Sequence, residues 1–208
     1  MKRGKYLLVI IGTVLVSAGI IASGIASDKP EISGLKDYIR IEKELHKNKN
    51  QINQTSDLDN LKISDFSIPI YYFSEGVDIR SYEGSGLGDI LEGSKERLWF
   101  MMDGRDASGI LIADDKETIK MGGDGKDLMK LYVTLEKEYE KGSDIRYIEF
   151  RGRGLFLVVH NHTEDVWLSP DLADSFKLQP YEKISSNDVL QGMKEQIELF
   201  SDGWFERK

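Results

Sequence analysis

The sequence predicts an α+β fold, in which an N-terminal transmembrane helix is followed by an antiparallel β-sheet domain with helices packed on one face. Three observations lead to this fold class. A long uncharged run follows a basic N-terminus, short segments rich in strand-forming residues alternate with turns that contain Gly or Asp, and apolar residues recur at helical spacing in a few longer segments. Behind the membrane segment, the chain of 208 residues has room for one domain or two small subdomains.

Residues 6–26 are expected to form a membrane-spanning signal-anchor helix. They contain no charged side chain, and a helix of this length is about 30 Å long, the thickness of the hydrocarbon core of a bilayer. The basic residues Lys2, Arg3 and Lys5 keep residues 1–5 in the cytoplasm, which places the rest of the chain outside. The alternative is a signal peptide that is cleaved near Ala26 and releases a secreted protein.

Residues 28–62 are predicted to form a juxtamembrane helix and a polar linker. Apolar residues at helical spacing among charged ones favour an amphipathic helix over residues 34–47. Residues 48–62 are rich in Asn, Gln and other polar residues, which is typical of a linker. The extracytoplasmic α+β domain is then expected to comprise residues 63–208.

The first half of this domain is expected to contain strands followed by one well-defined helix. Residues 66–73 are strand formers, but Pro69 lacks an N–H donor, so an edge strand is predicted there. Gly142 is suited to the left-handed conformation that ends a helix. The remaining elements expected in this half are strands over 97–102, 109–113 and 117–121 and a helix over 125–141.

The second half repeats the order of three strands and a helical segment. Ser186 is expected to cap the last helix and Gly203 to end it. The similarity of the two halves raises two alternatives, a duplicated three-strand-plus-helix unit or a single antiparallel sheet without duplication. The strands expected in the second half cover residues 145–151, 155–160 and 165–168.

Charge and cysteine content exclude several kinds of partner and chemistry. Residues 28–208 contain all 36 acidic residues of the chain but only 25 of its 28 basic ones, a net charge of −11. Such a charge disfavours binding to nucleic acids and to anionic lipid surfaces. Because the chain has no cysteine, it forms no disulfide and has no thiolate nucleophile, and in an exported domain this favours a bacterial source.

His160 and His162 are the sharpest local feature with possible chemistry. In an extended strand both imidazoles would point the same way, and Glu164 or Asp165 could supply a third metal ligand, as in an exported metal-dependent hydrolase. A turn expected at residues 161–163 would break this alignment, so a pair of polar residues at a hairpin tip is the preferred interpretation. We therefore predict no catalytic residue, no metal site and no cofactor.

Part of the chain is similar to a known family. Residues 118–123 read Thr-Ile-Lys-Met-Gly-Gly, and after the helix over 125–141 residues 144–151 read Asp-Ile-Arg-Tyr-Ile-Glu-Phe-Arg. With the strand over 154–159, this stretch, about residues 117–160, resembles the external β-domain of DivIB/FtsQ-type bacterial cell-division proteins. That resemblance implies a single membrane span and a non-enzymatic scaffold that binds other division proteins.

The function expected from the whole sequence is that of a single-pass membrane-anchored, extracytoplasmic module of the bacterial cell envelope. We expect it to bind or assemble envelope proteins rather than to act as an enzyme, because no residue pattern marks a reaction centre. Aromatic residues in the strands, such as Tyr72, are expected to lie mostly in the core, and those on a second face to form a partner-binding patch.

Overall fold

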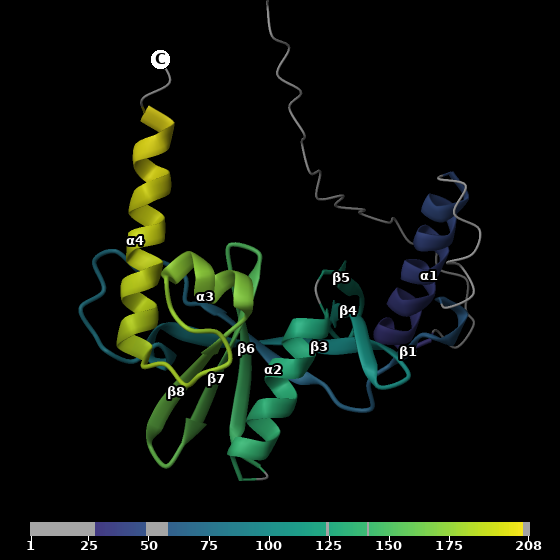
Figure 1. Cartoon of the computed structure of the whole chain (residues 1–208), viewed down its shortest axis with the longest axis horizontal. Coiled ribbons are helices and arrows are strands. Elements are labelled where there is room, and N and C mark those ends of the chain that lie inside the picture. The colour runs from purple at the N-terminus through teal and green to yellow at the C-terminus, as the bar shows by residue number, and fades with distance from the viewer. Residues whose placement is uncertain (1–27, 49–57, 124, 141, 206–208) are drawn as a thin grey trace, which may run out of the picture.

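The computed structural model describes residues 28–48, 58–123, 125–140 and 142–205 (Figure 1). The predicted cytoplasmic tail 1–5, the predicted span 6–26 and much of the polar linker lie outside the described residues. Among the residues that are described, no helix is both long enough and apolar enough to cross a membrane.

The domain is built on one mixed, mostly antiparallel sheet of eight strands, which confirms the α+β class. The strand order is β5-β4-β3-β2-β6-β7-β8, and β1 pairs with β3 beside this path. All pairs are antiparallel except β2 and β6, which run parallel where Ile70 faces Tyr147. The strands are β1 (Lys62–Ile63), β2 (Ile68–Phe73), β3 (Leu91–Asp103), β4 (Asp106–Ala113), β5 (Thr118–Gly122), β6 (Asp144–Phe150), β7 (Arg153–His160) and β8 (Thr163–Leu168).

The prediction that the Pro69 strand lies at an edge is wrong, because β2 lies in the middle of the sheet between β3 and β6. Two features explain why a central strand tolerates proline, which has no N–H to donate. The parallel pairing with β6 involves only Ile70 and Tyr71, so it begins after Pro69. The register with β3 also shifts between Pro69 and Tyr71.

The helices pack on both faces of the sheet, so the prediction of helices on one face is wrong. Along β7, Phe156 and Val158 pack in the same cluster as α2 (Gly125–Glu138), whereas the alternate residues Leu155 and Leu157 pack on the opposite face. That opposite face is covered at one end by α3 (Pro170–Phe176) and α4 (Ser186–Phe205), and at the other end by α1 (Pro30–Asn48). Figure 1 shows α1 and α4 at opposite ends of the domain.

This helix arrangement bears on the idea of a duplicated unit. The meanders β3-β4-β5 and β6-β7-β8 run outward from the centre of the sheet in opposite directions, as two copies related by an axis normal to the sheet would. Such an axis would leave both following helices on one face. Because α2 and α3 lie on opposite faces, the correspondence of the halves is limited to the strands.

The helix ends differ from the prediction in detail. Ser185, not Ser186, caps α4, because its Oγ accepts the Asp188 N–H at 3.1 Å. The helix also continues to Phe205, past the predicted stop at Gly203, and Figure 1 shows its far end extending beyond the rest of the domain. The helix expected over 34–47 lies within α1, and Gly142 has the expected positive φ of 103° after α2. The helix α3 and the short 3-10 helices η2 (Leu58–Asn60) and η3 (Gly88–Ile90) were not individually predicted.

Candidate functional site

His160 takes part in a polar cluster on the α2 face of the sheet, together with Asp165, Tyr139 and Trp167. His160 Nε2 lies 2.6 Å from Asp165 Oδ2, and the Tyr139 hydroxyl donates to the same oxygen at 2.8 Å. The Trp167 indole N–H donates to the Tyr139 hydroxyl at 3.0 Å. Because Tyr139 directly follows α2, the cluster ties the C-terminal end of this helix to β7 and β8.

The other predicted metal ligands lie elsewhere. His162 is exposed in the hairpin turn with Asn161, and both have positive φ values of 63° and 47°, so the predicted turn is confirmed. Glu164 points to the opposite face, where its carboxylate accepts the Gly88 N–H at 3.1 Å and the Ser186 hydroxyl at 2.8 Å. Among the described residues, no three His, Asp or Glu side chains are placed to hold a metal ion.

The geometry around His160 also differs from a nucleophile–histidine–carboxylate relay. Thr163 Oγ1 lies 3.4 Å from His160 Nε2, the same ring nitrogen that faces Asp165. A relay requires the hydroxyl and the carboxylate on different ring nitrogens, so that one nitrogen takes the proton while the other is held. The cluster is therefore better suited to holding α2 in place than to activating Thr163.

The pKa of Asp165 reflects this role. Burial alone would raise the pKa of this carboxyl, but the hydrogen bonds from His160 and Tyr139 and the nearby Lys183 ammonium outweigh burial and lower it. A lowered folded-state pKa means that the ionised carboxylate stabilises the fold above the unfolded value of about 3.9, and that this stabilisation is lost as the pH falls through the folded value.

We expect Asp165→Asn to lower the free energy of unfolding by about 1–2 kcal/mol at pH 7. The neutral amide lacks the negative charge of the carboxylate, which strengthens the hydrogen bonds with Tyr139 and His160. Urea unfolding of the full-length protein at several pH values measures this. The difference from the wild type should shrink as the pH falls below about 4, the unfolded-state pKa, and through the lowered pKa of Asp165 in the folded state. Asp115→Asn, in an exposed turn, is the control and should change little. A pH-independent loss would contradict the role of the charge.

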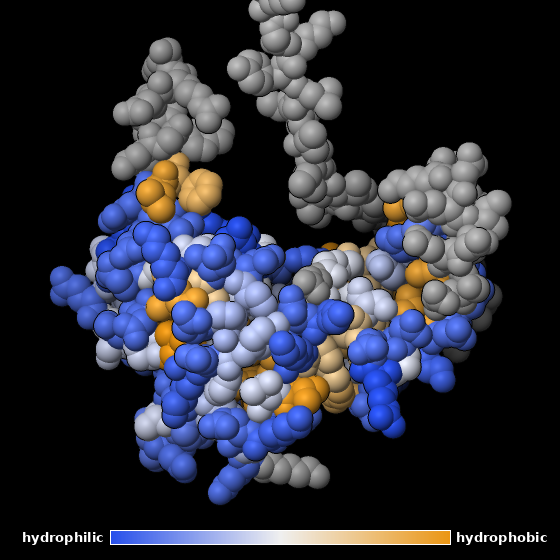
Figure 2. All heavy atoms as spheres, in the orientation of Figure 1, coloured by the Kyte–Doolittle hydropathy of each residue, from blue (hydrophilic) through white to orange (hydrophobic). Residues whose placement is uncertain are grey.

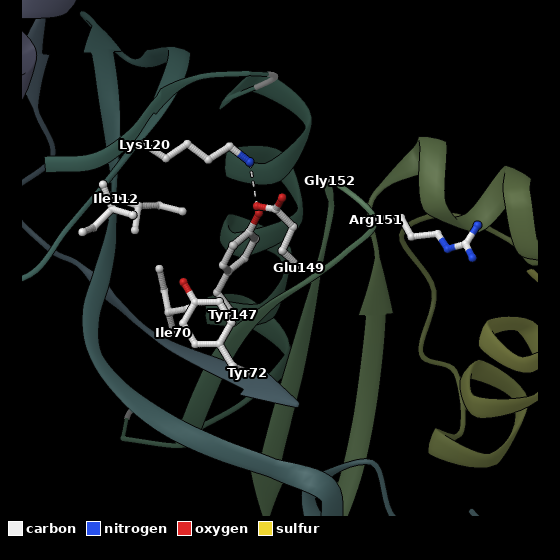
Figure 3. Close-up of a pocket in the computed structure, with 9 residues that line it drawn as sticks. Ile70, Tyr72, Ile112, Lys120, Tyr147, Glu149, Arg151 and Gly152 are labelled. Atoms are coloured by element: carbon white, nitrogen blue, oxygen red, sulfur yellow. Dashed lines mark hydrogen bonds and ion pairs between the residues drawn. The ribbon is translucent and has the colours of Figure 1, made fainter. Parts of the chain in front are cut away.

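A second candidate site lies where β5 and β6 approach each other on the α2 face. In the sheet order these strands are separated by β4, β3 and β2, about 19 Å in a flat sheet. Yet Lys120 Nζ on β5 lies 2.7 Å from Glu149 Oε2 on β6 (Figure 3). The sheet must therefore curl toward α2, and this ion pair bridges the two arms of the curl.

A cavity of about 250 Å³ lies at this bridge, and we call it the bridge cavity. Ile70, Ile112 and Tyr147 contribute a buried apolar wall, because they belong to the cluster that packs under α2. Tyr72 and Ile119 border it while remaining 43% and 44% exposed. The complete lining is Ile70, Tyr72, Ile112, Ile119, Lys120, Tyr147, Glu149, Arg151 and Gly152.

The position of Ile119 has a local cause. Ala113 pairs with Thr118 and Ile112 pairs with Lys120, so the register shifts at this point and Ile119 has no regular partner. At such a bulge two successive side chains are redirected. As a result Ile119 and Lys120 both line the bridge cavity.

Sequence reasoning missed the bridge cavity. Its lining comes from β2, from the paired strands β4 and β5, and from β6 with the turn after it, and these parts of the chain meet only because the sheet curls. One signal was present, because Lys120 lies between Ile119 and Met121, and Glu149 lies between Ile148 and Phe150, so each charge interrupts a run of apolar residues. Each lies on the strand face that is otherwise buried, since Lys120 pairs with the buried Ile112 and Glu149 lies two residues after the buried Tyr147.

The surface of the domain is largely hydrophilic, with apolar side chains in small patches (Figure 2). In the described part of the chain, the exposed large hydrophobic residues are Leu45, Tyr72, Ile119, Leu199 and Phe200. Two of them border the bridge cavity and two lie near the far end of α4.

The chain matches no protein-family model, no curated protein and no solved structure.

Proposed function

We propose that this protein is a membrane-anchored, extracytoplasmic binding or assembly module of the bacterial cell envelope, without catalytic activity, and that a partner protein docks at the bridge cavity. The observation that carries this proposal is the coincidence of a cavity with exposed apolar residues at its border. Tyr72 and Ile119 are large apolar side chains left open to solvent beside a concave apolar wall. Aromatic and aliphatic anchors at the centre of a protein interface have this setting.

The membrane part of the proposal rests on residues 6–26, an uncharged run long enough to span a bilayer behind Lys2, Arg3 and Lys5. With this segment as an anchor, the protein would lie in the cell membrane with its N-terminus in the cytoplasm. Secretion after cleavage near Ala26 is the alternative. Neither changes the surface that we propose for docking.

A cell-division scaffold of the DivIB/FtsQ type is a narrower form of the same proposal. The order β5-α2-β6-β7 over residues 117–160 agrees with the strand and helix order that this resemblance implies. The metal-dependent hydrolase alternative draws no support from the placement of His160 and His162, because the first pairs with Asp165 and the second lies in an exposed turn.

Site-specific photocrosslinking in intact cells tests the proposal. A photoreactive amino acid at position 72 or 119 should crosslink to the same partner protein, because both residues border the bridge cavity. The control is position 137, an exposed residue of α2 outside the cavity lining. Identical products from all three positions, or no product from 72 and 119, would contradict a docking site at the cavity.

A further inference from the structure

We infer that the bridge cavity receives an arginine side chain of the partner protein. This inference rests on the proposed function, in which a protein docks at that cavity, and it names the chemistry that the cavity recognises. Three observations support it, namely a tyrosine hydroxyl at the cavity without a hydrogen-bond partner among the described residues, an excess of negative charge around the cavity, and a small apolar cavity faced by tyrosine rings.

The first observation is the Tyr147 hydroxyl. Tyr147 is only 2% exposed and lines the cavity. Within the part of the chain that the structure describes, no group forms a hydrogen bond with its hydroxyl. Gly154 leaves the room for it, because a Cβ there would come within 2.9 Å of the hydroxyl oxygen. Because Tyr147 lines the cavity and its hydroxyl oxygen is not fully enclosed, a ligand in the cavity with a hydrogen-bonding head group would give this hydroxyl a partner.

The second observation is the charge at the rim. Glu149 is paired with Lys120 in the cavity lining. Glu96 lies outside the lining but accepts a hydrogen bond from the hydroxyl of Tyr72, a lining residue, so a second carboxylate lies next to the cavity. The Arg151 guanidinium points away from the ion pair in Figure 3 and lies over the Phe200 ring, 4.3 Å from its centroid. A single positive charge from the ligand would therefore neutralise the rim. The net charge of −11 for residues 28–208 attracts cationic partners from a distance.

The third observation is the size and lining of the cavity. Its volume of about 250 Å³ is below the range of roughly 300–1,000 Å³ that holds drug-sized ligands, which favours a single side chain. The aliphatic wall of Ile70 and Ile112 suits an apolar stem. The rings of Tyr72 and Tyr147 suit a cation. Arginine combines both properties, and its guanidinium is more weakly hydrated than an ammonium group, so it enters such a site at lower cost than lysine.

Titration of the full-length protein in mild detergent, with ¹³C-labelled isoleucine methyl groups observed by NMR, tests the inference. The probes are N-acetyl-arginine methylamide and N-acetyl-norleucine methylamide, which share an unbranched stem but differ in charge. We expect the arginine probe to shift the methyl signals of Ile70, Ile112 and Ile119 saturably, and to bind at least about tenfold more tightly than norleucine.

Variants of the protein locate the effect. Tyr147→Phe removes only the hydroxyl and Glu149→Gln removes only the charge, and each should weaken binding of the arginine probe by at least about fivefold. Glu138→Gln, an exposed change at the end of α2 outside the cavity lining, is the matched control and should leave binding unchanged. Circular dichroism spectra equal to the wild type show that each variant is folded.

The possible outcomes separate this inference from the proposed function. Equal binding of norleucine, or shifts that Glu149→Gln does not weaken, would overturn the arginine assignment. Free L-arginine binding about tenfold more tightly than the blocked probe would overturn it too, in favour of a small-molecule site. If these tests fail while crosslinking from positions 72 and 119 succeeds, the docking function stands with another partner chemistry; if both fail, neither stands.

Discussion

Phe156→Ala is expected to lower the free energy of unfolding by about 3–5 kcal/mol, the largest effect of any single substitution that we predict. Phe156 is fully buried at the centre of the cluster under α2, where its ring centroid lies 6.1 Å from that of Tyr132 and 5.7 Å from that of Tyr147. Removing the ring leaves a cavity between the sheet and α2 that these neighbours only partly fill. Urea unfolding of the full-length protein, followed by tryptophan fluorescence, measures the loss.

The same substitution at an exposed position is the control for this experiment. Phe200 in α4 is 56% exposed, so Phe200→Ala removes little buried area and should cost less than about 1 kcal/mol. Equal losses for Phe156→Ala and Phe200→Ala would show that the cluster beneath α2 is not the main core of the domain.

Gly125→Ala should also destabilise the domain strongly, by about 2–3 kcal/mol. Gly125 begins α2 directly against β4, and a Cβ at this position would come within 2.5 Å of the backbone N and O of Gly109. A clash with backbone cannot be relieved by rotating a side chain, so α2 or β4 must shift. This cost exceeds the gain of up to about 1 kcal/mol that alanine brings to a helix over glycine.

Gly93→Ala in β3 is the matched control. The nearest atom to a Cβ at Gly93 is in the Tyr71 ring at 3.4 Å, an ordinary contact, so alanine should be tolerated within about 0.5 kcal/mol. The same urea unfolding experiment compares the two glycine variants. If Gly125→Ala proved as harmless as Gly93→Ala, the close approach of α2 to β4 would not be a feature of the folded protein.

Local sequence patterns predicted the individual elements better than their arrangement. The strand segments and the helix over 125–141 follow from the alternation and spacing of apolar residues. The strands β3, β4, β7 and β8 contain the segments expected for them, and β5 and β6 contain all but one terminal residue of theirs. The central position of β2 could not be predicted, because the short parallel contact with β6 pairs residues far apart in the sequence. The placement of helices on both faces also depends on tertiary packing, which the period of a strand does not report when both faces are buried.

The candidate sites also combine features that local sequence predicts with features that depend on tertiary packing. The hairpin turn at Asn161 and His162 could be predicted from local residue types, and its positive φ values confirm it. The partners of Asp165 include Tyr139, which arrives from the end of α2, so the cluster around His160 depends on how that helix crosses the sheet. The bridge cavity needs the curl that joins Lys120 to Glu149, and no single segment encodes that curl.

The measurement that most directly tests the central claim is the accessibility of single cysteines in living cells. The chain has no cysteine, so Lys137→Cys places one thiol on the folded domain and Gly4→Cys places one in the predicted cytoplasmic tail. A membrane-impermeant maleimide should label Lys137→Cys in intact cells and Gly4→Cys only after the cells are opened. Labelling of Lys137→Cys that also requires opened cells would contradict a domain held outside the membrane.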